Sequence, residues 1–594
     1  MSSDFSTVLV RDSVLGGITD KLTYAVKSGA ASKTYQPFQS ISQSASSLTF
    51  NVTVPSENVV VDREVFVRST IRFTVTETGV ASGSFAGGYG SQYALQAFPL
   101  NHLFTTASAT INNSNVSSNI QDILPQLLQM MSQEELAKYD GMCPNLVDFN
   151  TALYTTNVAT SNANNVLATA NQTGYNKYFQ PRGSYPVKLV DFSRKVGSAT
   201  PTKTLTSSGD TDVFKLAYEV EVFEPIIGLS PFIYGQPAYN NQGLVGINAM
   251  NFVFNIDSTA KRFLSVGVAS TVVTKVELGI NVDGGASNSA IPFSGTELVV
   301  CFNSSQSTDL ITAKNVVPYT DIPRFITVSN VAIAGQGTEK SLSSNNIQLN
   351  QLPDLFIICV RKSIADMTVQ DAEYNCVINS VSINLNNASG LLSSANQFSL
   401  YQLSVKNGSK QTWAQFSGRV NQLVTKTGGD SGNGGLGTQA TTGSIFVVSP
   451  TDLSLPSYLA PGCIGSFNFQ VKLGVTQYVT ASNANITPEI VILAVNSGIF
   501  STVAGSSQIF TGILTKSLVE DAKSMQMVNP VLSAEYNRVL GGGIHGDMQN
   551  SGNEQMPAVK EAMKQKMKMA HSMGSGVYSG SGVMSGGKFS GMVR

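Results

Sequence analysis

Hydrophobic and polar residues alternate along most of this chain. Residues 65–76, VFVRSTIRFTVT, place Val67 and Ile71 on one face of an extended segment and Arg68 and Arg72 on the other. The same alternation occurs in residues 48–54, 216–222, 251–256, 466–475 and 489–496. Period-two alternation is typical of half-buried β-strands, and turns rich in Gly, Ser, Asn and Pro separate these stretches. The pattern therefore predicts an all-β protein built from antiparallel sandwiches or barrels.

Few segments have the period of an α-helix. Residues 119–140 carry apolar residues at helical spacing, and within them Glu135 follows Ser132 by three positions. This spacing is that of a capping box, in which each side chain accepts a hydrogen bond from the other residue's backbone N–H. We expect one short helix before Ser132 and a second one starting after it.

One passage of the first half returns in the second half. Residues 110–128, TINNSNVSSNIQDILPQLL, resemble residues 382–403, SINLNNASGLLSSANQFSLYQL, and the alignment sets Ile111 opposite Ile383. Both passages begin like a strand, continue through Asn and Ser, and end in an apolar stretch fit for a helix. They are interpreted as structural landmarks of one fold that occurs twice.

Two further blocks recur in the same order. Residues 224–235 match residues 449–462, and the apolar alternation of residues 252–256 matches that of residues 467–471. The offset between the copies falls from 272 to 215 residues along the chain, which predicts an insertion of about 57 residues in the first half. The polar stretch 152–208 is the expected place for it. Chance similarity between Asn- and Ser-rich segments is the alternative.

The length of the chain supports two large domains, because a single core stops growing at about 250–300 residues and the chain has 594. An eight-stranded jelly roll with a few short helices fits each copy; two unrelated sandwiches are the alternative. The predicted organisation is an N-terminal arm (1–40), a first jelly roll (41–305) with a loop insertion (152–208), a second jelly roll (306–530) and a flexible C-terminal tail rich in Gly, Met and Lys (531–594).

Charge is scarce and balanced. Charged residues make up 13% of the chain and the formal net charge is −1, whereas about 25% is usual in soluble domains. A nearly neutral surface favours self-association, and it does not suit a protein that binds nucleic acid through a basic face. Burial of the surface against copies of the same chain is the better interpretation.

Residues that could carry catalysis or bind a metal are sparse. His102 is the one histidine in the body of the chain, and no nucleophile elbow or metal-spaced partner surrounds it, so it is interpreted as structural. Asp210 and Asp212 are interpreted as a polar turn rather than a cation site. Glu219 and Glu221 are interpreted as a solvated strand face rather than a glycosidase pair. No catalytic residue, metal or cofactor is predicted, and the chain is predicted not to be an enzyme.

Cysteine use and apolar runs set the expected compartment. The five cysteines are scattered without a CxxC pair, and Cys359 in LFIICV is predicted to be buried, so no disulfide framework is expected. No apolar run is long enough for a transmembrane helix. Residues 1–17 contain Asp4, Arg11 and Asp12 in place of a continuous apolar core, which predicts cytosolic synthesis rather than secretion.

The C-terminal residues differ in kind from the rest. From Gly541 onward there are six basic and three acidic residues, and residues 557–573 have helical spacing. The lysines that could contact a nucleic acid, a membrane or a partner groove are Lys560, Lys564, Lys566 and Lys568. A flexible tail with a solvated helix is the alternative.

Three segments carry a resemblance to a known family: residues 50–75 (FNVTVPSENVVVDREVFVRSTIRFTV), 347–363 (IQLNQLPDLFIICVRKS) and 383–408 (INLNNASGLLSSANQFSLYQLSVKNG). Over about residues 40–520 the chain resembles the double jelly-roll major capsid proteins of icosahedral double-stranded DNA viruses, in particular those of virophages and Polinton-like viruses. The resemblance is carried by the order of blocks rather than by a rigid signature.

The resemblance implies a structural protein that forms pseudo-hexameric homotrimers, which tile an icosahedral shell together with a pentameric penton protein and minor capsid proteins. It places the chain in the virion, after synthesis in the host cytoplasm or a virus factory, with the insertion facing outward and the termini facing the genome. The tail would then contact DNA or an internal membrane. The sequence identifies no host receptor.

The resemblance also implies a site of processing. Some family members are cleaved by a cysteine protease near paired glycines that follow Met, Ile or Leu, and Gly542–Gly543 and Gly586–Gly587 lie in such settings. Linker flexibility is the alternative explanation of these glycines. The alternative to the capsid function as a whole is a β-sandwich adhesin or carbohydrate-binding surface protein, and a β-sandwich hydrolase is a third.

Overall fold

A computed structural model describes the body of the chain. It covers residues 31–512 except 57–58, 91–92, 149–181, 183–184, 233–242, 267–272, 306–313, 335–336, 370–372, 387, 425–434, 454–459, 479–484 and 504. The predicted tail 531–594, with its four lysines and its two glycine pairs, and most of the predicted arm lie outside the described residues.

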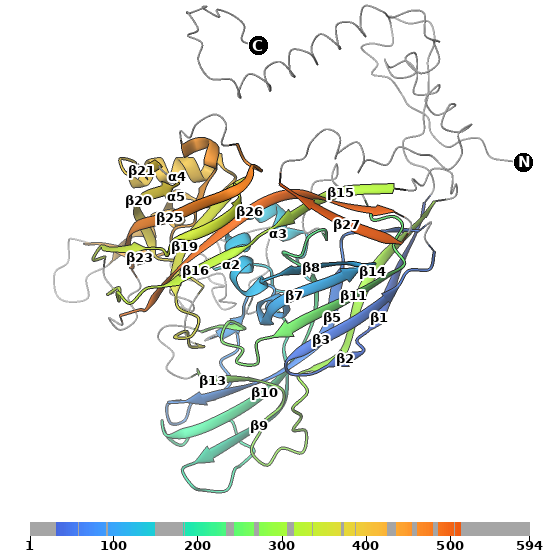
Figure 1. Ribbon diagram of the computed structural model, residues 1–594. Coiled ribbons are helices and arrows are strands. Elements are labelled where there is room, and N and C mark those ends of the chain that lie inside the picture. Colours follow the sequence, from blue (N-terminus) through green and yellow to red (C-terminus); the bar gives the residue numbers. More distant parts are fainter. Residues whose placement is uncertain are drawn as a thin grey trace, which may run out of the picture. The chain divides into compact units, whose positions relative to one another are not determined.

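Two antiparallel sheets form the first sandwich (Figure 1). The larger sheet has the order β1-β14-β5-β10-β9, with β13 paired to β5 and β4 to β14: β1 (Ala31–Gln39), β14 (Phe293–Ser305), β5 (Phe66–Thr78), β10 (Asp212–Pro225), β9 (Lys188–Val196), β13 (Val273–Leu278) and β4 (Val60–Val61). The smaller sheet has the order β2-β3-β11-β7-β8: β2 (Ser42–Gln43), β3 (Ser47–Thr53), β11 (Ala249–Ile256), β7 (Phe104–Ile111) and β8 (Ser114–Ser118). A separate pair joins β12 (Leu264–Val266) and β6 (Tyr93–Leu95).

The predicted alternation explains how the two sheets pack. Phe50 of β3, Phe73 of β5 and Phe252 of β11 are completely buried in one core. The side chains between them on the same strands, such as Arg68 and Asn251, lie on the outer faces. Each sheet therefore buries one face against the other, as expected for a sandwich.

Short helices follow the β7–β8 hairpin. They are α2 (Ile120–Met130) and α3 (Gln133–Ala137), and α1 (Pro99–Leu103) precedes the hairpin. The capping box at Ser132 is confirmed: its Oγ accepts from the Glu135 backbone N–H at 3.3 Å, and the Glu135 carboxylate accepts from the Ser132 N–H at 2.7 Å.

The second sandwich is built in the same way. Its larger sheet has the order β15-β26-β19-β24, with β16 and β27 paired to β26: β15 (Lys314–Asp321), β26 (Pro488–Val503), β19 (Leu355–Lys362), β24 (Phe446–Val448), β16 (Arg324–Val328) and β27 (Ser506–Thr511). Its smaller sheet has the order β17-β25-β20-β21, with β18 paired to β25: β17 (Lys340–Ser343), β25 (Ile464–Thr476), β20 (Val377–Leu385), β21 (Ala388–Leu391) and β18 (Ile347–Gln351). The remaining elements are α4 (Gln397–Lys406), α5 (Trp413–Phe416), the pair β22 (Arg419–Val424) and β23 (Gly435–Ala440), and a 3₁₀ turn (Pro450–Leu453).

The two halves repeat one strand order. The run β1-β14-β5-β10 corresponds to β15-β26-β19-β24, and β11-β7-β8 corresponds to β25-β20-β21. In each half a short helix follows the hairpin, so α4 is the counterpart of α2. The repeated passages of the sequence therefore mark the same hairpin and helix in two copies of one fold.

The alignment of the first repeated passage is two residues off. Ile111 pairs with Ser114 and with Met250, and its structural counterpart in the second half is Leu385, which pairs with Ala388 and Phe469. Ile383 lies two positions earlier on the same strand face. A shift of two leaves every side chain on its face of a strand, so the hydrophobic pattern alone does not distinguish the two alignments.

The turn residue fixes the register of both hairpins. Asn112 has φ 50° and Asn386 has φ 51°, a left-handed conformation that Asn tolerates better than most residues. The side-chain oxygen of Asn112 accepts from the backbone N–H of Asn248 at 2.9 Å, and that of Asn386 accepts from Asn468 at 2.8 Å. The two asparagines are therefore equivalent in conformation and in bonding.

For the third repeated block, the sequence alignment and the structural alignment differ by four residues. Phe252 pairs with Ala109 of β7, and the residue with the same position in the second half is Val471, which pairs with Ile383 of β20. The alignment that set Phe252 opposite Phe467 is therefore wrong in register, although it matches the correct strands. An even displacement again keeps the apolar residues on the core face.

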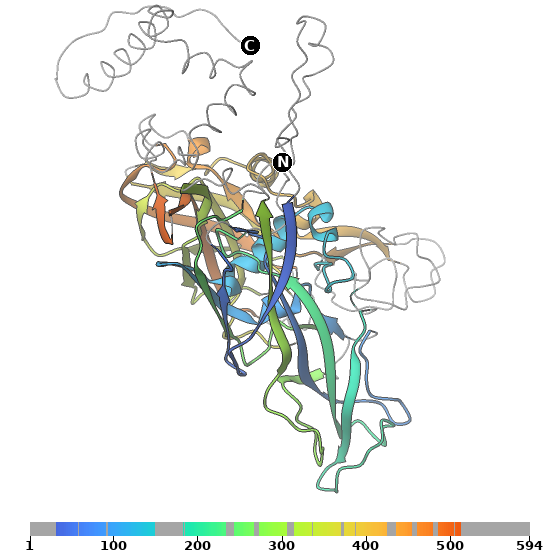
Figure 2. The same cartoon turned by 90° about the vertical axis from the view of Figure 1, so that its right-hand side faces the viewer.

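Strands extend into two segments that were expected to be arm and loop. Residues 31–39 form β1, and every residue of β1 pairs with a residue of β14. Within the stretch 152–208, residues up to 181 lie outside the described residues, whereas β9 pairs with β10. In Figures 1 and 2 the ends of β9, β10 and β13 extend away from the second sandwich.

One long strand takes part in both halves. The first part of β26 pairs with β16 and β19, and Ile490 and Ile492 lie in the second core. Its last part pairs with β15 and β27, and Phe500 lies in the first core together with Val317 and Tyr319 of β15. The two cores therefore share a continuous backbone element.

Candidate functional site: the interface between the two sandwiches

His102 lies in α1 and is buried. Its Nδ1 donates to the carbonyl oxygen of Phe98 at 3.2 Å. Burial, with the positive charge of Arg262 nearby, lowers the pKa of His102 to about 4, so the imidazole is neutral at physiological pH. This arrangement is that of a structural histidine, as predicted.

The carboxylates named by the sequence hold structural hydrogen bonds. Asp212 accepts from the backbone N–H of Ser208 at 2.8 Å, the leading cause of its lowered pKa, and from Nε of Arg194 at 2.7 Å. Glu219 pairs with Arg72 at 2.7 Å and Glu221 with Arg68 at 2.5 Å across β5 and β10. These pairs make a charged ladder on the outer face of the first large sheet, which is the predicted role of a solvated strand face.

Glu224 is a buried carboxylate beside α1. It accepts from the backbone N–H groups of Leu100 and Asn101 at 2.8 and 2.9 Å and from the Asn101 side chain at 2.8 Å. Burial raises the pKa of Glu224 to about 7, although the three N–H donors act to lower it. Its contacts tie β10 to α1 at the end of the first core.

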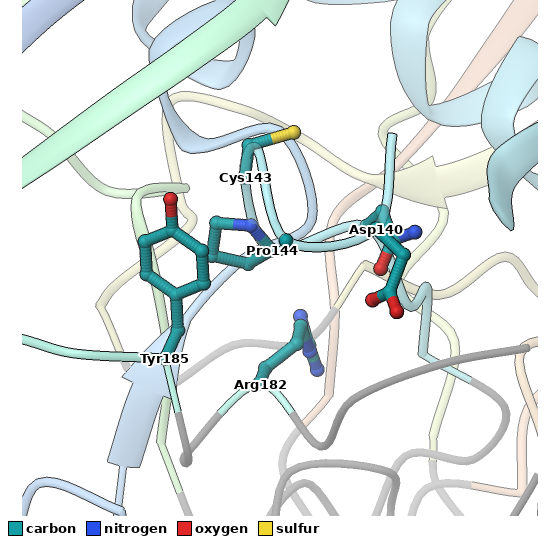
Figure 3. Close-up of a pocket in the computed structure, with 7 residues that line it drawn as sticks. Asp140, Cys143, Pro144, Arg182 and Tyr185 are labelled. Atoms are coloured by element: carbon teal, nitrogen blue, oxygen red, sulfur yellow. The ribbon is translucent and has the colours of Figure 1, made fainter. Parts of the chain in front are cut away.

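A hollow of about 170 Å³, a volume that includes open solvent, lies beside α3 (Figure 3). Arg182 at its wall is buried and forms an ion pair with Asp148. The Cys143 sulfur points away from Arg182, and burial raises the pKa of this thiol well above its usual value. A protonated thiol is a poor nucleophile, and Tyr185 is engaged as a donor to the Met142 carbonyl at 2.8 Å. The side chains around this hollow therefore serve packing.

In the described part of the chain, no three His, Cys, Asp or Glu side chains lie in a group that could hold a metal ion. None of the helices described is long and apolar enough to cross a lipid bilayer. The buried contacts between the two sandwiches join charged and polar side chains of both halves.

Helix α2 of the first half lies on the outer face of the second large sheet. Ile120, Leu124 and Leu128 face the first core, whereas Ile123 is buried in a second apolar cluster with Leu493. That cluster also contains Ile357, Cys359, Ile445, Val447 and Val491. The amphipathic helix thus has two apolar faces, one for each sandwich, and both are removed from water.

A buried charge cluster crosses the same interface. The Asp122 carboxylate of α2 is fully buried and pairs with Arg361 of β19 and with Arg324 of β16. Arg361 also donates to Glu489 of β26 at 2.6 Å. Arg361 and the two carboxylates are thus buried, Arg324 reaches them from a side chain that is 37% exposed, and the four charges neutralise one another. Such pairing is the condition under which a buried charge is tolerated.

Further polar contacts surround this cluster. Arg262 pairs with Glu373 of the second half and donates to the Gln121 carbonyl at 2.5 Å. Burial alone raises the pKa of Glu373, but the neighbouring cations, Arg262 foremost, more than offset it, so the pKa lies below its usual value. Asn375 donates to the Gln126 side chain at 3.3 Å. Both halves of the chain thus contribute to each set of contacts.

The sequence contained a signal for this interface that the alternation obscured. Residues 355–360 and 490–495 are continuously apolar, and nearly all of their side chains are buried. Continuous apolar strands are typical of sheets covered on both faces. Residues 489–496 were predicted as a half-buried strand, and that prediction is wrong, because α2 covers their outer face.

Two tandem antiparallel sandwiches of one strand order, joined through a buried interface, define the class of double jelly-roll structural proteins. A family model described as "Sputnik virophage major capsid protein 1st domain" matches residues 3–303, and one described as "Major capsid protein V20 C-terminal domain" matches residues 322–498. The chain therefore belongs to the Sputnik virophage major capsid protein family.

Individual relatives agree with this assignment. The "Putative capsid protein V20" of Sputnik virophage is 26% identical over 556 residues, which cover 90% of this chain and 84% of the relative. The cryo-EM structure of the Sputnik virophage contains a chain with a TM-score of 0.68 and 24% identity, covering 89% of this chain and 97% of that one. The crystal structure of the mavirus major capsid protein has a TM-score of 0.60 and 14% sequence identity, and the match covers 89% of this chain and 100% of that one.

These findings confirm the predicted all-β double jelly roll and the capsid function. The role of the family is structural and its place is the capsid shell. The adhesin or carbohydrate-binding alternative is not favoured by any of the relatives.

Proposed function

We propose that three copies of this chain form a trimeric capsomer with six sandwiches around its axis, and that these capsomers tile an icosahedral shell. The observation that carries the proposal is the pair of like sandwiches in one chain, held together by a neutralised buried charge cluster and an apolar helix face. Such an interface keeps the pair as one block, so three blocks give a nearly sixfold outline. The near-neutral surface favours association of like copies.

The described strands support one orientation of the block in the shell. The chain enters at Ala31, which pairs with Ser305, and it leaves after β27, which is bonded to the β7–β8 turn through Ser507. The far ends of β9 and β10 lie at the opposite end of the first sandwich (Figures 1 and 2). On this basis the β9–β10 end faces outward and the terminal segments face the interior.

The interior position gives the C-terminal tail its proposed role. Lys560, Lys564, Lys566 and Lys568 would contact DNA or an internal membrane, and the shell would include a penton protein and minor capsid proteins as partners. Cleavage at Gly542–Gly543 or Gly586–Gly587 would accompany assembly in the host cytoplasm or virus factory. Intact mass measured on purified particles tests the cleavage: a full-length species alone would remove it.

Assembly itself is tested with the purified full-length chain. Sedimentation velocity over a concentration series should show trimers, and negative-stain electron microscopy at high concentration should show hexagonal capsomers or shells. A chain that stays monomeric at every concentration, without particles, would contradict the proposal. The matched control is the same preparation in 6 M urea, which should sediment as an unfolded monomer.

A further inference from the structure

The helices after the hairpin are equivalent in the two halves but are not equally covered. α2 and α4 follow the equivalent hairpins β7–β8 and β20–β21, and each is followed by a short helix that begins with a capping box, at Ser132 and at Thr412. α2 is covered by the second large sheet. The outer face of α4 is exposed, on the side of the second sandwich away from α2 (Figure 1).

The exposed face of α4 and α5 carries an aromatic patch, defined here as Phe398, Tyr401, Val405 and Trp413. Phe398 is 50% exposed, Val405 43% and Trp413 39%. The rings touch one another, with centroids 5.3 Å apart for Phe398 and Trp413 and 5.4 Å for Tyr401 and Trp413. Exposed apolar side chains that cluster on one face are a feature of interaction surfaces, and Trp and Tyr are enriched at the centres of interfaces.

The surface equivalent to the one that α2 covers is the outer face of the first large sheet. It carries Phe66 and Phe223, which are half-buried and stacked 4.8 Å apart, and the ladder of Arg68 and Glu221. The side chain of Arg68 is 53% exposed and that of Glu221 60%. In the second half the centre of the equivalent strip is buried under α2, and only its margins, such as Ile326 and Leu355, are partly exposed. The first sheet thus presents a more open strip, with charges along it and, at one end, aromatic rings that Tyr139 of the same chain partly covers.

The chemistry of the patch fits this strip. Between Glu373 and Asp430 the sequence contains no acidic residue, and the patch is flanked by Lys410 and Arg419 and by Lys406, which pairs with Asp452 at 2.6 Å. On the strip, Glu221 and Glu297 pair with Arg68, and Glu219 pairs with Arg72. The remaining oxygens of these carboxylates can accept from Lys410 and Arg419, and the half-exposed Arg68 offers a guanidinium to aromatic ring faces. A strip that pairs with another copy must stay soluble until assembly, which explains why it is more polar than the face buried under α2.

We propose that the aromatic patch of one copy docks on the β5–β10 strip of a second copy, as α2 docks on the second large sheet within one chain. The occupant is a second copy because the contact within one chain supplies the template. Within a chain, the helix α2 of the first half packs on the large sheet of the second half. Between chains, the equivalent helix α4 of the second half would pack on the large sheet of the first half. This proposal rests on the trimeric capsomer and names the surfaces that join its copies.

Trp413 is the only tryptophan of the chain, so its fluorescence reports on the patch directly. On passing from dilute monomer to concentrated trimer, its emission should shift to shorter wavelength and its quenching by acrylamide should fall several-fold. Phe398→Glu should raise the concentration needed for half-trimerisation about 30-fold or more, since central aromatic contacts contribute at least about 2 kcal/mol. The matched control is Phe85→Glu, at a residue that is 77% exposed and lies outside the patch, which should trimerise like the natural chain.

A second measurement, photocrosslinking, identifies the partner surface even where the Phe398→Glu variant folds poorly. A photoreactive phenylalanine analogue at position 398 should crosslink to peptides of β5 or β10, and mixing isotopically labelled with unlabelled copies shows whether the bond joins two chains. Trimers in which Trp413 stays accessible, or crosslinks that go elsewhere, would overturn the docking while leaving the trimer intact. Absence of trimers from the natural chain would overturn both proposals.

Discussion

The buried charge cluster gives the sharpest prediction, through the substitution Arg361→Met. The Arg361 side chain is 3% exposed and lies between Asp122 and Glu489, whose side chains are 0% and 6% exposed. Methionine fills much of the same volume without a charge. The variant keeps two carboxylates in a place without water and leaves Arg324, which is 37% exposed, as the remaining cation of the cluster.

The expected cost follows from the burial of the two carboxylates. Removing one partner of a buried ion pair costs about 3–5 kcal/mol, and Arg361 serves two partners, so we expect about 4 kcal/mol in the free energy of unfolding. With a urea dependence of about 3 kcal/mol per molar for a domain of this size, the midpoint should fall by about 1.3 M. Replacing all three residues together, by Asp122→Leu, Arg361→Met and Glu489→Leu, should recover stability to within about 1 kcal/mol, because the only charge of the cluster left without its partner is Arg324, whose side chain is 37% exposed and can be hydrated.

Equilibrium unfolding in urea, followed by Trp413 fluorescence, reports on the second sandwich. The matched control is Lys406→Met: this lysine also forms an ion pair, with Asp452 at 2.6 Å, but its side chain is 69% exposed. Exposed pairs contribute no more than about 1 kcal/mol. If Arg361→Met shifts the midpoint no further than Lys406→Met does, the cluster does not stabilise the interface and the reasoning fails.

Three further predictions concern single positions. Burial raises the pKa of Glu224 from 4.5 to about 7 in the folded state, so the contribution of this group to the free energy of unfolding should be largest below about pH 4.5 and fall by about 3 kcal/mol by pH 7 and above; the difference between the natural chain and Glu224→Gln in urea titrations at several pH values isolates it from the opposite contribution of His102. Asn386→Ala should cost about 2 kcal/mol, from strain at φ 51° and a lost hydrogen bond, and Asn386→Gly about half as much; equal melting points would contradict this. Gly443→Ala should prevent folding of the second sandwich, because its Cβ would lie 1.8 Å from the Asn375 carbonyl oxygen, whereas Gly408→Ala, with open space around it, should cost about 1 kcal/mol; soluble yield and circular dichroism compare the two.

Local patterns were sufficient for the elements and for the fold class. The alternation of residues 65–76 specifies β5 and its faces, and the Ser132–Glu135 spacing specifies the start of α3. The repeat located the two hairpins but not their register, since a displacement by an even number of residues changes no face. The register is set by Asn112 and Asn386, whose backbone conformation no hydrophobic pattern reveals.

The interface between the sandwiches lies beyond such reasoning. Asp122 and Arg361 are separated by 239 positions, and neither stands in a motif that points to the other. Asp122 looks like an ordinary acidic residue in the first turn of a helix, where it is common. Only the continuous apolar runs at residues 355–360 and 490–495 carried information about it, since they require cover on both faces of the sheet.

The course of β26 has a consequence for how the chain is made. Phe500 and the β15 residues Val317 and Tyr319 belong to the first core, although the last strand of the first large sheet, β14, ends at Ser305. During synthesis the first core therefore stays incomplete until the end of β26, which is encoded about 200 residues after β14, has been added. At roughly 5–20 residues per second this delay is on the order of 10–40 seconds. Nascent chains thus reach their closed form only when nearly the whole body has left the ribosome, which couples the completion of both cores to the end of translation.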